Sequence, residues 1–180
     1  ANLSKRVYGS TNLPLSNKGI NHIIELSRAG IYPKAHNAIM YTSGLLRAEQ
    51  TFFLLYGCKN HIILPELREY HFGKFEMKED PDYHAWINDK EGATSCPDGE
   101  SIMNFRTRVS AGFARILEKP GKEKNREKDS IVICHDGVIS MIMSICFPDV
   151  MSNVFHWQPD TGRGYTLNLL DGEVISYGDI

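Results

Sequence analysis

The sequence predicts an α/β fold, a three-layer sandwich in which helices cover both faces of a mostly parallel sheet with an antiparallel edge strand. Segments with apolar residues at helical spacing alternate with short apolar runs rich in β-branched residues, as in chains that build parallel sheets. Two alternating segments around Asp171-Gly172 are typical of a closing hairpin. With 180 residues, 42% of them hydrophobic, the chain predicts a single domain over residues 1–180.

The first half of the chain predicts two helices around a short strand. In SNKGINHIIELSRAG, Ser16 is a candidate N-cap and Gly30 a candidate stop, and the isoleucines between them share one side of a helix. The run AIMYTS predicts a strand that ends at Ser43. GLLRAEQTFFLLYG follows at once and predicts a second helix, closed by Gly57.

The second half continues the alternation after an irregular stretch. HIILPEL predicts another short strand, and residues 68–100 mix Gly, Pro, aromatic and charged residues with no period, as functional loops often do. SIVIC and GVISMIMSIC predict a buried strand and an apolar helix, and YTLNLL and EVISYG the hairpin strands. Before them, residues 100–119 predict a helix whose apolar face is formed by Ile102, Phe105, Val109, Phe113 and Leu117.

Composition excludes several classes of protein. A formal charge of −2 and a pI near 6.4 give no field that would attract nucleic acid or an acidic membrane. No apolar run approaches the roughly 20 residues that span a bilayer, and the N-terminus lacks a signal peptide's apolar core. Four cysteines without a C-x-x-C pair indicate a reducing compartment and no structural zinc. We therefore expect a cytoplasmic protein.

Polar side chains follow two of the predicted strands at the point where each strand ends. In open α/β sheets ligands gather at these carboxyl ends, where helix N-termini favour anions. Ser43 ends one strand with Arg47 about one helical turn further on, and His135 ends another. An arginine fork and a histidine could together clamp a phosphate. Taken singly, Arg47 could equally be an exposed helical arginine and His135 a hydrogen-bonded residue at a strand end.

The irregular stretch supplies candidates for a general acid. LPELREYHFGKFE carries Glu66, Glu69 and Glu76 among aromatic residues, and a carboxyl group in partly apolar surroundings can hold its proton at neutral pH. Composition does not choose among the three glutamates, which could all be surface carboxylates. The aromatic residues nearby could line an apolar lid or form the loop's own packing core.

Five motifs, in order along most of the chain, resemble those of the histidine phosphatase superfamily, which contains the cofactor-dependent phosphoglycerate mutases and many phosphomonoesterases. NLSKRVYGSTNLPLSNKG resembles the segment after the family's nucleophile, and YTSGLLRAEQT resembles its phosphate-binding arginine motif. LREYHFGKFE resembles the acid motif, PDGES the loop that opens the long helix, and HDGVI the second histidine. Each motif is weak alone, and their common order carries the resemblance.

The resemblance implies a role for each matched residue. Arg47 would bind the transferred phosphoryl group, and His135 would stabilise its equatorial oxygens. Glu69 would protonate the leaving oxygen and then activate water. The remaining matched positions, near the phosphate or the substrate, are Asn2, Tyr8 and Gly9.

The family's nucleophile is the histidine of an Arg-His-Gly triplet that ends the first strand, shortly before the position of Asn2. None of the seven histidines here follows an arginine and precedes a glycine. We therefore expect roughly ten further N-terminal residues, a central strand and the triplet, in the natural protein. Without that strand the sheet would expose two strand edges. The alternative is a naturally shortened, inactive relative.

The resemblance implies a phosphomonoester hydrolase that works through a phosphohistidine, without metal or other cofactor, on a small phosphorylated metabolite. A phosphoglycerate mutase is the nearest alternative, although the span 76–97 is short and acidic where such mutases usually carry a long, basic insert. A phospho-ligand or protein-binding module without a nucleophile is a third reading. A metal site of His71, His84 and His135 is disfavoured, since no ligand pair has i, i+4 spacing beside a carboxylate. The expected oligomeric state is monomer or homodimer.

Overall fold

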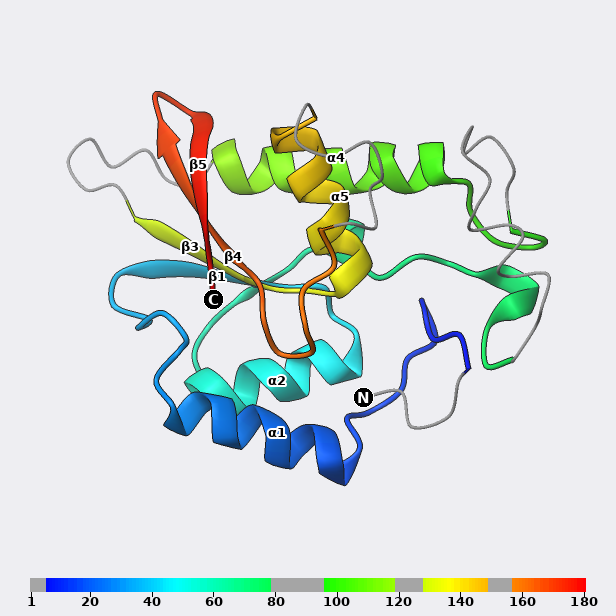
Figure 1. The fold of residues 1–180 in the computed structure, drawn as a ribbon, viewed down its shortest axis with the longest axis horizontal. Helices are drawn as coiled ribbons and strands as arrows, with labels where there is room; N and C mark the ends of the chain where they lie inside the picture. Colours follow the sequence, from blue (N-terminus) through cyan, green and yellow to red (C-terminus); the bar gives the residue numbers. More distant parts are fainter. Residues whose placement is uncertain (1–5, 79–95, 119–127, 149–156) are drawn as a thin grey trace.

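Helices lie on both sides of a sheet in the computed structural model, which describes residues 6–78, 96–118, 128–148 and 157–180 (Figure 1). In the view of Figure 1, one pair of the described helices lies below the sheet and another pair above it. The lower pair is α1 (Asn17–Arg28) and α2 (Leu46–Tyr56), and the upper pair is α4 (Ile102–Glu118) and α5 (Asp136–Cys146). The two helices of each pair are in contact, and Figure 1 shows one pair on each face of the sheet.

The described central sheet has three parallel strands. Its order is β2 (Ile62–Ile63), β1 (Ala38–Thr42), β3 (Asp129–Ile133), with Thr42 opposite both Ile63 and Ile133. All three strands therefore end at the same edge, next to the N-termini of α2 and α5 (Figure 1). The predicted α/β class is confirmed.

The closing hairpin is antiparallel, as the sequence predicts. β4 (Tyr165–Leu170) pairs with β5 (Glu173–Asp179). Asp171 and Gly172 connect them with φ angles of 52° and 86°, the left-handed conformation that Asp-Gly turns favour. In the described residues the hairpin is a sheet of its own, and β3 and β4 each pair with one neighbour.

Local signals start and end the helices at the positions that the sequence predicts. The Ser16 side chain accepts a hydrogen bond from the Gly19 amide at 3.1 Å and caps α1. Gly57 follows α2 with a φ of 68°, which an L side chain rarely adopts. β2 has only two residues because Pro65, which cannot donate to a ladder, begins the short 3-10 helix η1 (Pro65–Leu67).

The core divides between the two faces of the sheet. Met40 packs with Phe52 and Ile131 on the α2 side, whereas its neighbour Tyr41 packs with Val138 and other residues of the α4 and α5 side. This alternation follows from the two-residue period of a strand. A sheet covered by helices on both faces needs apolar side chains in both directions, as the apolar runs predict.

The buried face of α4 differs from the predicted one in its second half. Phe105 and Val109 are buried as expected, but the next buried residues are Gly112 and Ile116, while Leu117 is only partly buried. A Cβ on Gly112 would lie 2.9 Å from the Cβ of Glu66. The helix therefore approaches η1 closely along a glycine, a contact that a hydrophobic pattern does not register.

The aromatic residues described in the irregular stretch form packing contacts. Tyr70 is buried, with ring centroids 4.8 Å from Phe72 and 5.0 Å from Phe105 of α4. Phe75, in the 3-10 helix η2 (Gly73–Phe75), is also buried in the core. These residues anchor the loop to α4 as a packing core.

Truncation of Val109 should test the α4 interface. Val109→Ala removes two methyl groups from a fully buried site and should lower the free energy of unfolding by about 2 kcal/mol. Met103→Ala on the same helix is the control, because Met103 is 64% exposed and should cost little. Equal losses for both variants in urea denaturation would contradict the assigned interface.

Candidate active site

Arg47 lies in the first turn of α2 and is fixed by the loop that follows Tyr8. Its Nη1 donates to the Thr11 carbonyl at 2.9 Å and its Nη2 to the Gly9 carbonyl at 2.6 Å. Burial lowers the pKa of Arg47, and the nearby carboxylates of Glu69, Glu76 and Asp136 act in the opposite direction. The guanidinium is thus oriented by backbone carbonyls and half-buried among acidic groups.

Glu76 organises the loop that holds Arg47. Its carboxylate accepts hydrogen bonds from the amides of Gly9, Ser10 and Phe72 and from the hydroxyls of Ser10 and Thr11. Burial raises the pKa of Glu76, but these hydrogen bonds together outweigh it and leave the pKa lowered. Glu76 is therefore an anionic anchor, a role that its position in the sequence alone does not indicate.

His135 follows β3 by two residues and occupies the N-cap position of α5. It is 8% exposed, and its Nε2 lies 2.8 Å from the Ser43 hydroxyl at the end of β1. Burial, with the positive charges of Arg47 and Arg108, lowers the pKa of His135 well below its ordinary value. The imidazole is therefore neutral at physiological pH and has one N–H to donate.

Glu69 is buried against the first turn of α5. Its two carboxyl oxygens accept hydrogen bonds from the Tyr70 amide at 2.7 Å and the Gly137 amide at 3.1 Å. Burial, the charge of Asp136 and a hydrogen bond between the two carboxyl groups together raise its pKa to about 8, although the two amide hydrogen bonds act in the opposite direction. Glu69 therefore holds a proton at neutral pH, as a general acid must.

A glycine is required next to Glu69. An added Cβ at Gly137 would lie 2.4 Å from Glu69 Oε1, closer than real atoms approach. The third residue of the His-Asp-Gly sequence thus leaves room for the carboxyl group. A similar constraint applies to Gly9, where a Cβ would lie 2.0 Å from the Tyr70 carbonyl oxygen.

The structure brings together the three principal residues of the sequence analysis. Arg47 interacts electrostatically with both Glu69 and His135. Arg47 and His135 lie where α2 and α5 begin, and Glu69 reaches the start of α5 from the loop after η1. Gly9 joins them through its carbonyl, and Tyr8 is a half-buried neighbour in the same loop. Asn2 lies outside the described residues.

The other carboxylates of the acid motif have different surroundings. Glu66 pairs with Arg115 of α4, and Glu76 is the anchor described above. Of the three candidate acids, Glu69 is the one that is buried and in contact with another carboxyl group among the residues that the structure describes. The residue that sequence reasoning missed is Asp136. Its only sequence signal is a carboxylate in the first turn of a helix, which usually serves the helix dipole.

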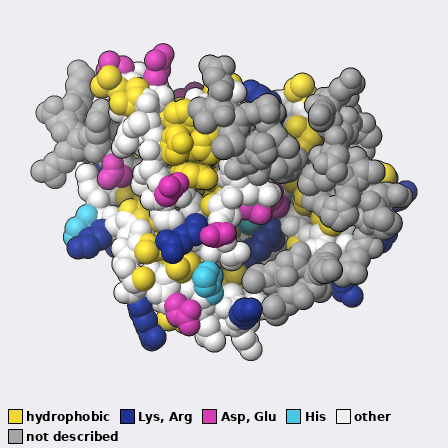
Figure 2. All heavy atoms as spheres, viewed as in Figure 1, with side chains coloured by type: hydrophobic (Ala, Val, Ile, Leu, Met, Phe, Trp, Pro, Cys, Tyr) yellow, Lys and Arg dark blue, Asp and Glu magenta, His cyan; other side chains and the backbone are white. Residues whose placement is uncertain are grey.

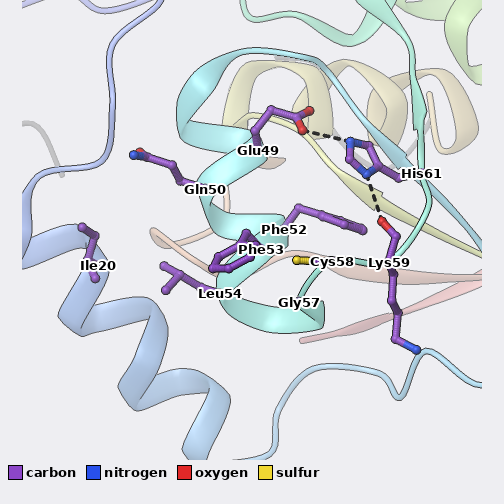
Figure 3. A pocket seen from close by; sticks show the side chains of 10 residues that line it. All are labelled: Ile20, Glu49, Gln50, Phe52, Phe53, Leu54, Gly57, Cys58, Lys59 and His61. Carbon is purple, nitrogen blue, oxygen red and sulfur yellow. Dashed lines mark hydrogen bonds and ion pairs between the residues drawn. The ribbon is translucent and has the colours of Figure 1, made fainter.

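A separate surface hollow of about 510 Å³ lies where α1, α2 and the turn after α2 meet (Figure 3). Ile20, Phe53 and Cys58 are among its lining residues. Its polar lining residues are Glu49, Gln50, Lys59 and His61, and the side chains of Glu49 and His61 are 2.9 Å apart. Arg47, Glu69 and His135 are not among its lining residues, so this hollow is distinct from the candidate active site.

Two further properties of the described residues bear on partners. They contain no group of three His, Cys, Asp or Glu residues arranged to hold a metal ion. Nor do they contain a helix long and apolar enough to cross a membrane. Figure 2 shows charged side chains of both signs across the middle of one face, with hydrophobic side chains over the region of the hairpin and α5.

Comparison with known proteins gives several relatives. The chain is 27% identical over 172 residues to adenosylcobalamin/alpha-ribazole phosphatase of Escherichia coli, a match that covers 90% of this chain and 81% of the relative. The crystal structure of alpha-ribazole phosphatase from Shigella flexneri has a TM-score of 0.75 at 24% identity, covering 94% of this chain and 85% of that one. That of a phosphoglycerate mutase from Thermus thermophilus has a TM-score of 0.66 at 25% identity, covering 98% and 90%.

The family itself follows from the match to a family model. Residues 1–174 fit the family model of the histidine phosphatase superfamily, branch 1. The match spans all the motifs on which the resemblance in the sequence was based, including those that contain Arg47, Glu69 and His135. This protein belongs to the histidine phosphatase superfamily.

Proposed function

We propose that this protein is a phosphomonoester hydrolase that acts through a phosphohistidine intermediate without a metal ion. The observation that carries the proposal is Glu69, a buried carboxyl group that keeps its proton at neutral pH beside Arg47 and His135. Transfer of a phosphoryl group to a nucleophilic histidine also requires an acid for the leaving oxygen and fixed donors for the phosphoryl oxygens. Glu69 can supply the acid, and Arg47 and the neutral His135 the donors. The relatives are named phosphatases, which supports hydrolysis as the overall reaction.

Arg47 would bind the phosphoryl group. Two of its five N–H donors are engaged by the carbonyls of Gly9 and Thr11, which leaves three directed elsewhere from a fixed guanidinium plane. The neutral His135 would donate its N–H to a second oxygen. Such fixed donors stabilise the charge that develops on the transferring group without needing to reorganise.

In the first step, a histidine nitrogen attacks phosphorus and the bond from phosphorus to the ester oxygen breaks. Glu69 gives its proton to that oxygen, so that an alcohol leaves instead of an alkoxide. In the second step, water attacks the phosphohistidine and returns a proton to the Glu69 carboxylate. The phosphorus–nitrogen bond breaks, its electron pair returns to the imidazole, and inorganic phosphate is released.

The nucleophile is proposed to be a histidine that precedes Asn2, at the end of a strand. In the described residues β3 and β4 are end strands of two separate sheets, and one strand between them would join the two sheets. His135 is a poor nucleophile candidate because its Nε2 is engaged by Ser43. Two other described histidines are engaged elsewhere, His61 with Glu49 and His22 with the Thr161 carbonyl.

Trapping the phosphoenzyme tests this function. The full-length protein, mixed with a radiolabelled phosphomonoester and quenched in alkaline denaturant, should carry label on a histidine upstream of Asn2 and should release inorganic phosphate. Alpha-ribazole 5′-phosphate, suggested by the names of the relatives, belongs in the substrate panel. Label on His135 would contradict the assigned roles, isomerised phosphoglycerate would indicate a mutase, and saturable binding without label or product would indicate a binding module.

Loss of the arginine fork should lower turnover sharply. Arg47→Ala should reduce kcat by about a hundredfold to a thousandfold, because a fixed donor to the transferring group is removed. Arg47→Lys, which keeps the charge but not the planar fork, should retain part of the activity. Arg28→Ala, on the exposed last turn of α1, is the control. Turnover by Arg47→Ala at the wild-type rate would exclude the role.

The carboxyl pair predicts a specific pH dependence. Activity should decline as pH rises through about 8, where Glu69 loses its proton. Asp136→Asn removes a negative charge that raises the pKa of Glu69. The decline of kcat/KM at high pH should therefore shift to a lower pH, by roughly one unit or more. Asp98→Asn, a change at an exposed site that pairs with Lys74, is the control. An unchanged decline in Asp136→Asn would contradict the pairing.

A further inference from the structure

We infer that Arg108 and Glu100 are positioning residues that hold the acid loop, residues 66–71, so that Glu69 meets the leaving oxygen. The inference rests on the proposed function and concerns residues that lie outside the Arg47, Glu69 and His135 set. Arg108 belongs to α4 and Glu100 to the turn that precedes it. Neither side chain contacts Glu69 through a hydrogen bond described here, so their effect would pass through the backbone of the loop.

Arg108 binds two backbone carbonyls on the N-terminal side of Glu69. Its Nη1 donates to the carbonyl of Arg68 at 2.7 Å and to that of Glu66 at 2.9 Å. Its Nε and Nη2 donate to the Glu100 carboxylate, which fixes the guanidinium plane. With four of its five donors engaged in this way, Arg108 is built to hold a chain segment and not a phosphate.

Glu100 holds the other side of the acid residue. Its Oε1 accepts a hydrogen bond from the His71 amide at 2.9 Å, and its own amide donates to the His71 carbonyl at 3.0 Å. Its carbonyl also accepts a hydrogen bond from the Tyr70 hydroxyl. The pair is shielded, with side chains 26% exposed for Arg108 and 14% for Glu100, so solvent screens it less than a surface pair.

One face of α4 follows the acid loop. Arg108, Gly112 and Arg115 are separated by four and three residues, and therefore lie on the same side of the helix. Gly112 allows the helix to approach Glu66 and Leu67, and Arg115 pairs with the Glu66 side chain. Of these contacts, the one from Arg108 reaches the backbone next to the acid. Loss of the Arg108 side chain should therefore displace Glu69, whereas loss of the Arg115 side chain should not.

A displaced acid has a distinct kinetic signature. Proton transfer to the leaving oxygen needs heavy-atom distances of about 2.6–3.2 Å, and a small misplacement can cost about a hundredfold in rate. An alkyl ester depends on this proton because an alkoxide is a poor leaving group. A p-nitrophenyl ester does not, since its phenolate leaves unassisted. The parameter to compare is kcat/KM, because hydrolysis of the phosphohistidine is common to both esters.

The test compares these two esters in the full-length protein. Arg108→Met should lower kcat/KM for an alkyl phosphomonoester by about tenfold to a hundredfold and for p-nitrophenyl phosphate by less than about threefold. Glu100→Gln keeps an acceptor for the His71 amide and should give a smaller loss with the same selectivity. If Arg108→Met does not fold, the selectivity of Glu100→Gln between the two esters tests the inference instead. Arg115→Met, which removes an ion pair to the same loop, is the matched control and should affect neither ester.

Each outcome bears on one of the two proposals. Equal losses on both esters in a folded variant would mean that Arg108 acts through the fold or through its charge near His135 and not by placing the acid, and would overturn this inference while leaving the proposed function in place. Selective loss in Arg115→Met as large as in Arg108→Met would also overturn it, because the effect would not be specific to the backbone contact. Absence of turnover of either ester by the wild type would overturn the proposed function and this inference with it.

Discussion

The Glu69 carboxyl group is buried between the loop that carries it and the first turn of α5, where it meets two amide N–H groups and the carboxyl group of Asp136. Two carboxyl groups can share a hydrogen bond only if one of them holds a proton. Burial disfavours the charged form further, so the proton stays on the pair at neutral pH. Gly137, the N-terminus of α5 and the end of β3 are all placed around this contact.

Two separate sets of contacts hold the residues of the site in place. The short stretch Gly9–Thr11 is fixed by Glu76 and in turn fixes Arg47, so the cation is oriented from one side. From the other side, α4 holds the acid loop through Arg108 and Glu100. Both supports use a charged side chain to satisfy backbone groups, because loops without a ladder of their own leave those groups unpaired.

Much of the fold could be predicted because the relevant signals are local. Ser16, Gly57 and the Asp171-Gly172 turn act within a few residues of themselves, and apolar periodicity separates the strands from the helices. The position of Ile116 on the buried face of α4 could not be predicted this way, because Gly112 brings the helix close to η1. The short β2 likewise reflects Pro65, which ends the pairing sooner than the apolar run indicates.

The sequence by itself determined the α/β class and brought Arg47 and His135 to neighbouring strand ends, because parallel strands end at one edge of a sheet. The family motifs also singled out Glu69 among three glutamates. The tertiary structure alone decided which glutamate is buried against another carboxyl group, which one anchors a loop, and which pairs with an arginine. Burial and partners depend on residues distant in the sequence, and these partners, more than residue type, determine whether a carboxyl group keeps its proton.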